Sequence, residues 1–313
     1  RWPILDERRF SRELVAHRPW SRVRFEENPP VKDLVRHAAD YDEPSHDLLF
    51  AASRRALHDL PGSHPVFSGH GGDALMMGGA VVLRQLLGRA HMAAAYREAR
   101  LWADERDQPL LKVLGSTLRP TGQPPGRYPW ASGRVAREAS RLYRAAARRL
   151  RRLAGGSLAA AQFIASAQRG LRQLPADGAD LRYPYLYRPL VEFALSTPAR
   201  LKVKGAAEKL VLREAMRGRL PEVILARRDK TAFDTLFAYG FAQYWAELEP
   251  LLEKPRLEEM DILAPGGLRR LCEAVRQGRS ERLVEAIHAL GAEAWLRATE
   301  AQPSAGDRRE HAT

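Results

Sequence analysis

The sequence predicts an α/β fold in which part of a parallel sheet is followed by a large, mainly helical region. Two observations support this fold class. Helix and strand patterns alternate over residues 1–80 and lead into a glycine-rich turn, whereas residues 81–300 have apolar residues at helical spacing almost throughout. Residues 301–313 are charged and rich in small residues, so we expect a disordered tail.

The first eighty residues predict the order helix, strand, helix, helix, strand, loop and helix. The expected helices cover residues 6–16, 31–39 and 47–60, and the expected strands cover residues 22–25 and 64–67. This order is typical of the far half of a parallel sheet. Such a sheet binds its ligand at the carboxyl ends of its strands.

Residues beyond 80 predict a series of helices joined by short turns. The expected helices are 81–87, 90–106, 109–118, 134–153, 157–174, 208–216, 236–247, 266–277 and 281–299. Proline and glycine crowd residues 119–133, which predicts a loop or hinge. Helix 134–153 carries eight arginines against Glu138, so we expect it at the surface. An anion-binding face and a merely solvated face remain open for it, and the scarcity of aromatic residues argues against nucleic acid.

The composition is that of a soluble globular protein, with 45% hydrophobic residues among 313. No stretch approaches the roughly 18 apolar residues of a membrane span, so we expect no membrane partner. Cys272 is the only cysteine, which excludes an internal disulfide and is typical of a cytoplasmic protein. Its place on a helical apolar stripe favours a buried structural thiol. Lysine and arginine exceed aspartate and glutamate by 51 − 38 = 13, which favours an anionic partner or a solvated basic face.

The strongest local signal is the glycine-rich turn Val66 to Gly79, VFSGHGGDALMMGG. Three glycines in four positions let backbone amides converge, and a following helix adds a partial positive charge, so the turn can bind an anion such as phosphate. The residues expected around the anion are Ser68, Gly69, Gly71 and Gly72. Asp73 would repel a phosphate unless a divalent cation, usually Mg²⁺, lay between them. The turn therefore predicts a site for a metal-bound polyphosphate, with a tight structural turn as the alternative.

Four motifs resemble, in order and spacing, the synthetase domain of the asparagine synthetase family. They are SGHGGD at 68–73, RYPYL at 182–186, KLVLR at 209–213 and RDKTAF at 228–233. The resemblance implies the ATP-pyrophosphatase fold, present here in part. Residues 1–80 would be the C-terminal part of the nucleotide-binding unit, and residues 81–300 the helical synthetase and substrate region. It also implies that ATP and Mg²⁺ adenylate a carboxylate, and that an amine then attacks to give an amide, AMP and pyrophosphate.

The same resemblance implies roles for single residues. Residues 68–73 would hold pyrophosphate, with Asp73 as the Mg²⁺ ligand, and Lys230 would be a catalytic cation that stabilises charge during acyl transfer. Lys209 stands at the start of a helix, where an ion pair with a nearby acid and a phosphate contact both remain open. Arg182 either contacts the substrate or braces the loop before the next helix.

Two departures from the family pattern favour a ring-forming branch. Asparagine-forming enzymes usually carry acids at the positions of His70 and Ala74, and the loop resembles most closely that of the lasso peptide macrolactam synthetases. The expected substrate is then a precursor peptide, whose Asp or Glu side chain is joined to its N-terminal amine. Asparagine synthesis from a small carboxylate is the alternative. A histidine titrates near neutral pH, so His70 either helps to deprotonate the amine or hydrogen-bonds within its loop.

The family's Ser-Gly-Gly-x-Asp-Ser loop, which grips ATP and adds a second Mg²⁺ carboxylate, does not occur in the sequence. We therefore expect either an N-terminally truncated piece of a longer enzyme or a degenerate relative, and at best weak activity from this chain alone. A partner protein could supply the missing loop or bind a leader peptide. A non-catalytic protein that binds a peptide or a partner remains a further alternative.

Overall fold

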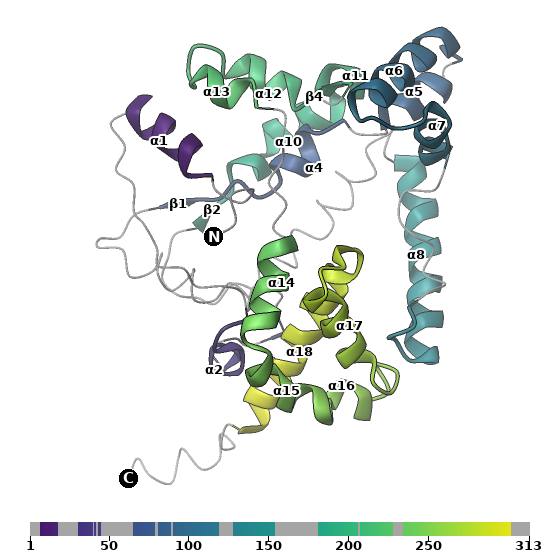
Figure 1. Cartoon of the computed structure of the whole chain (residues 1–313). Helices are drawn as coiled ribbons and strands as arrows, with labels where there is room; N and C mark the ends of the chain where they lie inside the picture. Colours follow the sequence, from purple (N-terminus) through teal and green to yellow (C-terminus); the bar gives the residue numbers. More distant parts are fainter. Residues whose placement is uncertain are drawn as a thin grey trace.

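The structure is a computed structural model of the chain, and helices dominate the part that it describes. The described residues are 7–17, 31–39, 41, 43–44, 65–78, 81–88, 90–118, 128–153, 181–205, 207–227 and 234–301. Figure 1 shows these residues as an upper and a lower group of elements, with one long helix along the side. That helix, α8 (Gly133–Leu153), is tied to the lower group at its N-terminus, where Arg134 Nε lies 3.3 Å from Asp261 Oδ2.

The upper group contains short strands and the helices that surround them (Figure 1). Its elements are α1 (Arg8–His17), β1 (Val66–Phe67), α4 (Gly72–Met76), α5 (Val81–Gly88), α6 (Met92–Glu105), α7 (Leu110–Leu118), β2 (Leu181–Arg182), the 3₁₀ turn η3 (Pro184–Leu186), α10 (Arg188–Ser196), α11 (Ala199–Lys202), β3 (Val203–Lys204), β4 (Ala207–Glu208), α12 (Leu210–Ala215) and α13 (Glu222–Leu225). Two small apolar clusters stabilise it, one between α5, α6 and α7 and one between α4 and α10.

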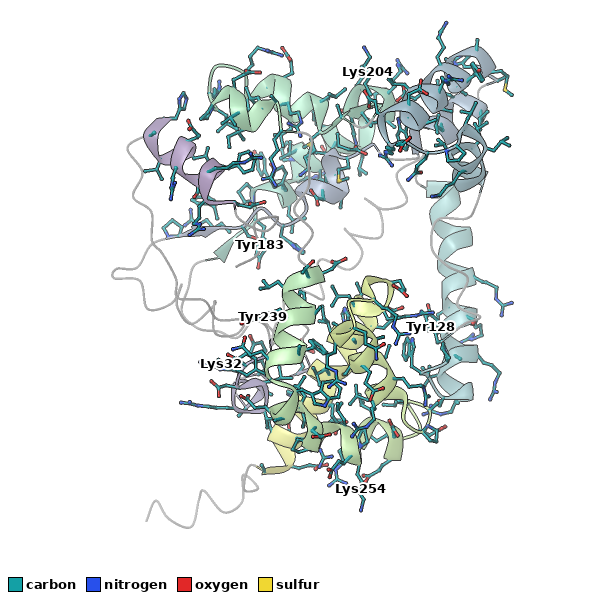
Figure 2. The ribbon with its side chains drawn as sticks, in the orientation of Figure 1. Lys32, Tyr128, Tyr183, Lys204, Tyr239 and Lys254 are labelled. Carbon is teal, nitrogen blue, oxygen red and sulfur yellow. The ribbon has the colours of Figure 1, made fainter. Side chains whose placement is uncertain are left out.

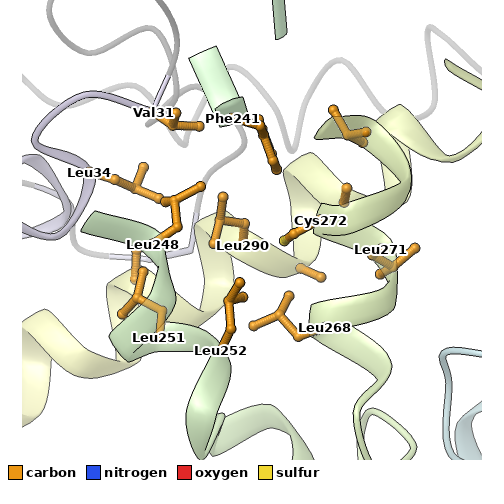
Figure 3. Close-up of a cluster of buried hydrophobic side chains, with 14 of the residues drawn as sticks. Val31, Leu34, Phe241, Leu248, Leu251, Leu252, Leu268, Leu271, Cys272 and Leu290 are labelled. Atoms are coloured by element: carbon orange, nitrogen blue, oxygen red, sulfur yellow. The ribbon is translucent and has the colours of Figure 1, made fainter. Parts of the chain in front are cut away.

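The lower group is helical and holds the largest apolar core. Its elements are α2 (Leu34–Ala38), α14 (Asp234–Gln243), α15 (Trp245–Glu253), α16 (Arg256–Glu259), α17 (Gly267–Arg276), the 3₁₀ turn η4 (Ser280–Arg282) and α18 (Leu283–Ala301). Leu268, Leu271, Cys272 and Val275 are all buried and recur at the i, i+3, i+4, i+7 spacing of one helix face. Figure 3 shows the first three of them beside Leu290 of α18. The expected burial of Cys272 is thus confirmed, and burial raises the pKa of its thiol.

The described strands form two pairs. β1 and β2 are parallel, with Val66 opposite Leu181 and Phe67 opposite Arg182. β3 and β4 form an antiparallel hairpin, which the sequence did not predict. Among the described residues these are the only sheets, so the larger parallel sheet of the ATP-pyrophosphatase fold is not shown. The expected strand 22–25 lies outside the described residues.

Most expected helices that fall on described residues are confirmed, because their apolar residues recur at helical spacing. Helices α5 to α8 begin and end within two residues of their predicted limits. The single helix expected at 236–247 is wrong: two helices, α14 and α15, meet there at Tyr244. The expected helices 47–60 and 157–174 and the tail 302–313 lie outside the described residues. No helix in the described ranges is both long and apolar enough to cross a membrane.

Candidate functional site

The glycine-rich turn predicted to bind phosphate follows β1 and lies beside β2. The backbone N–H of Ser68 donates to the carbonyl of Arg182 at 2.8 Å, which closes the Phe67–Arg182 pair at the end of the parallel ladder. The N–H of His70 donates to Ser68 Oγ at 3.2 Å, and the N–H of Gly72 donates to the carbonyl of Gly69 at 3.2 Å. The chain thus turns tightly before α4 begins.

Two glycines of this turn are required by its geometry. Gly71 has φ +92° and ψ −19°, a conformation that residues with a Cβ rarely adopt. A Cβ at Gly72 would lie 3.1 Å from the ring of Tyr185. Gly69 differs from both, because a Cβ there would meet no atom of the described residues within 4 Å. The space over Gly69 is therefore open to a ligand.

Several backbone amides of the turn are available to such a ligand. Within the residues that the structure describes, the N–H groups of Gly69, Gly71 and Ala74 donate to no protein acceptor. Backbone amides without a protein acceptor at a turn can attract an anion. The turn could therefore hold one end of a polyphosphate, and phosphate binding there stays a prediction.

An ion pair joins the turn to a segment far away in the sequence. Lys209 Nζ lies 2.5 Å from Asp73 Oδ1, and the side chains are 34% and 47% exposed, respectively. Lys209 has φ +62°, a left-handed conformation that costs a residue with a Cβ about 1–2 kcal/mol. Such strain at a polar site favours a functional role for the side chain that it positions. The ion pair that the sequence left open at Lys209 is thus present, and its carboxylate partner is the expected Mg²⁺ ligand.

Tyr185 is a site residue to which the sequence assigned no role. It lies in η3, and its ring packs against Gly72. Burial, and then the negative charge of Asp73, raise the pKa of its phenol. The signal that could have indicated it was the aromatic run between the two prolines Pro184 and Pro189.

His70 and Arg182 lie at the same turn as Ser68 and Asp73. The ring of His70 is exposed and stands edge-on to that of Tyr183, with their centroids 6.2 Å apart; Figure 2 labels Tyr183. Arg182 braces the turn through its carbonyl, and its side chain is exposed. The proton-transfer role of His70 and the substrate role of Arg182 stay predictions. Lys230 lies outside the described residues, so its catalytic role stays a prediction too.

The donor groups fit part of a Mg²⁺ and polyphosphate site. In the described ranges no three or more His, Cys, Asp or Glu side chains gather into a metal site. Asp73 supplies one carboxylate beside the unused amides. Mg²⁺ usually keeps several waters and binds one or two carboxylates together with phosphate oxygens. A single carboxylate next to the turn therefore suits Mg²⁺ that arrives with a polyphosphate better than a resident metal ion.

Comparison with known proteins gives a family for the chain. A protein-family model described as asparagine synthase matches residues 3–297. No curated protein and no solved structure matches the chain in the corresponding searches. The family match spans the glycine-rich turn, both members of the Asp73–Lys209 pair and most of the helical region. The chain therefore belongs to the asparagine synthase family, whose members use ATP to form amide bonds.

Proposed function

We propose that this chain serves an enzyme that joins a carboxyl group to an amine through a carboxyl-adenylate, with release of AMP and pyrophosphate. The observation that carries the proposal is the Asp73–Lys209 pair at the edge of the open glycine-rich turn. A carboxylate, a cation and unused amides together match the charges of Mg²⁺ and pyrophosphate.

The chain's own residues would divide the work as follows. The amides of Gly69 and Ala74 would bind phosphate oxygens, and Asp73 would be the protein ligand of Mg²⁺. Lys209, already beside Asp73, would offset phosphate charge. Lys230 would stabilise the charge that develops when the amine attacks. Mg-ATP, when bound, supplies the adenylyl group that activates the carboxyl and the pyrophosphate that leaves.

His70 would take the proton of the attacking amine. Its exposed ring stands at the turn, edge-on to Tyr183, so an amine can approach it from solvent. A general base must lie within hydrogen-bond reach of the proton that it removes, and a histidine is suited to this at neutral pH. The position of His70 at the turn is what supports this role. The alternative role for His70 is a hydrogen bond within the turn.

We further propose that the substrate is a precursor peptide and that the product is a macrolactam. Histidine and alanine stand at positions 70 and 74, where asparagine-forming relatives usually carry acids. A groove of about 780 Å³ is lined by residues of α11, α12 and α13, among them Leu201, Arg213 and Glu214. Its size is that of a site for a ligand larger than aspartate. The net charge of +13 also favours a substrate with acidic side chains.

The proposal is tested by pyrophosphate release from Mg-ATP with the complete native protein, once with candidate precursor peptides and once with aspartate and ammonia. Asp73→Asn and Lys230→Ala should each lower the rate at least about 100-fold. The Asp73 carboxylate is half exposed, so its loss should cost less than about 1 kcal/mol of stability. Asp104→Asn is the matched control, because Asp104 also forms an exposed ion pair: its Oδ1 lies 3.2 Å from Arg100 Nε on α6. It should leave the rate unchanged.

The outcomes separate the candidate functions. Pyrophosphate release that survives both Asp73→Asn and Lys230→Ala would refute the catalytic assignment. Release driven by aspartate and ammonia alone would replace macrolactam closure by asparagine synthesis. Peptide binding without pyrophosphate release, unchanged in both variants, would favour the non-catalytic alternative.

A further inference from the structure

Lys202 is a buried lysine that no role described above uses. Lys202 is the last residue of α11, and it is only 4% exposed. Its ammonium donates to the carbonyl of Leu75 at 2.9 Å and to the carbonyl of Ala194. No acidic side chain pairs with it in the part of the chain that the structure describes. Burial lowers the pKa of this amine, as expected where no carboxylate offsets the cost of burying charge.

Both carbonyls lie at the C-terminal ends of helices. Leu75 is in the last turn of α4, and Ala194 is in the last turn of α10. The residue four positions after Ala194 is Pro198, which has no N–H to donate. Carbonyls at a helix C-terminus lack helical partners and carry partial negative charge. Lys202 therefore satisfies and neutralises the ends of two helices with one ammonium group.

These two helices carry the proposed site at their other ends. Asp73 is in the first turn of α4, and α10 follows the 3₁₀ turn that contains Tyr185. Leu75 and Ala194 are buried in one small cluster, and Tyr185 packs against it. The spacing between the C-terminal ends of α4 and α10 therefore affects how Asp73 and Tyr185 face each other.

The segment that follows Lys202 contacts α4 at two more points. Glu208 Oε2 accepts the backbone N–H of Gly78 at 2.9 Å, just after α4, and Lys209 pairs with Asp73 at its start. Lys202 adds the contact at Leu75, so Lys202, Glu208 and Lys209 together hold α4 at its beginning and its end. Of these contacts, only the Lys202 bonds also include α10.

We propose that Lys202 is a positioning residue of the ligase site, whose ammonium holds the C-terminal ends of α4 and α10 together so that Asp73 keeps its place beside the bound pyrophosphate. The identity of the ligand in this inference rests on the proposed function. Lys202→Met keeps the length and the apolar stem of the side chain but removes both hydrogen bonds. Two buried carbonyls then lose their donor, and α4 is free to shift against α10.

Three measurements on the complete protein test this inference. The first is hydrogen–deuterium exchange of residues 72–78, which should become at least about tenfold faster in Lys202→Met because α4 opens locally more often. Exchange in α17 should not change. The second is calorimetric titration with Mg-pyrophosphate, where a displaced Asp73 should weaken binding about 10- to 100-fold. In steady-state assays the KM for Mg-ATP should rise more than kcat falls.

Matched variants separate positioning from a general loss of stability. Lys204→Met removes an exposed lysine two residues away on β3, labelled in Figure 2, and should match the wild type in all three measurements. Lys202→Arg keeps a buried cation that can donate to both carbonyls and should restore part of the pyrophosphate affinity. If Lys202→Met does not fold, Lys202→Gln, which is shorter and uncharged, takes its place with the same expectations.

The results test the positioning role of Lys202 separately from the proposed ligase function. Unchanged exchange of residues 72–78 in a folded Lys202→Met or Lys202→Gln protein overturns the positioning role. The same holds if Lys204→Met weakens pyrophosphate binding equally. If the wild type does not bind Mg-pyrophosphate while Lys202→Met still accelerates exchange of residues 72–78, the positioning of α4 holds and the proposed function fails.

Discussion

Glu293 is a fully buried carboxylate in the lower helical group, and its loss should destabilise the fold strongly. It lies on α18 with 0% exposure. Its Oε1 accepts the backbone N–H of Arg256 at 2.9 Å, and its Oε2 accepts that of Leu257 at 3.1 Å. These are the first two residues of α16, whose N–H groups have no helical partner. Arg297, one turn later on α18, donates its Nε to the same carboxylate at 3.0 Å and offsets its charge.

Glu293→Ala should lower the free energy of unfolding by about 3–5 kcal/mol. The change removes three hydrogen bonds to a charged acceptor, each worth about 1.5–3 kcal/mol. Their sum overstates the loss, because the Arg297 side chain is 28% exposed and can turn to water. What remains is the cost of two unpaired N–H groups and of a broken buried ion pair, for which losses of about 3–5 kcal/mol are usual.

The measurement is urea unfolding followed by far-UV circular dichroism, with Glu300→Ala as the control. Glu300 lies on the same helix, and its Oε2 is 2.9 Å from Arg256 Nε, but its side chain is 49% exposed. Its removal should cost less than about 1 kcal/mol. If Glu293→Ala costs no more than Glu300→Ala, the buried carboxylate does not cap α16 and the reasoning is refuted.

Three further predictions concern packing, backbone recognition and pH. Gly78→Ala should cost about 1–3 kcal/mol, because a Cβ there would collide with β3 and lie 2.9 Å from a carbonyl of α11. A Cβ at Gly115 on α7 would meet no atom of the described residues within 4 Å, so Gly115→Ala should raise the free energy of unfolding by up to about 1 kcal/mol. Equal urea midpoints for the two variants would contradict this packing. Arg213→Lys should lower the free energy of unfolding by about 1–3 kcal/mol, because the guanidinium of Arg213 donates to carbonyls of both β4 and α13. Arg217→Lys, at an exposed position, should change that free energy hardly at all in the same assay. The raised pKa of buried Cys272 should make stability fall above about pH 8.5, where only the unfolded chain ionises its thiol; rapid thiol labelling of the native protein would count against this burial.

The family, the glycine-rich turn and most of the long helices could be predicted from the sequence alone. These features depend on residues close together in the chain. Helical spacing sets α5 to α8, and the glycines at 71 and 72 fit a turn whose backbone needs a positive φ and a close approach. Where the local pattern continued across a break, as at Tyr244, the sequence predicted one helix and the fold has two.

The sequence could not predict which distant residues meet at that turn. Lys202 has the character of a surface residue in the sequence, because lysine is rarely buried. Its burial follows from the two helix ends that converge on it. Asp73 and Lys209 belong to separate motifs in the sequence, and the fold brings them together where Glu208 also accepts the N–H of Gly78 just after α4. Such contacts arise from the meeting of elements far apart in the chain, which no local pattern of residue types specifies.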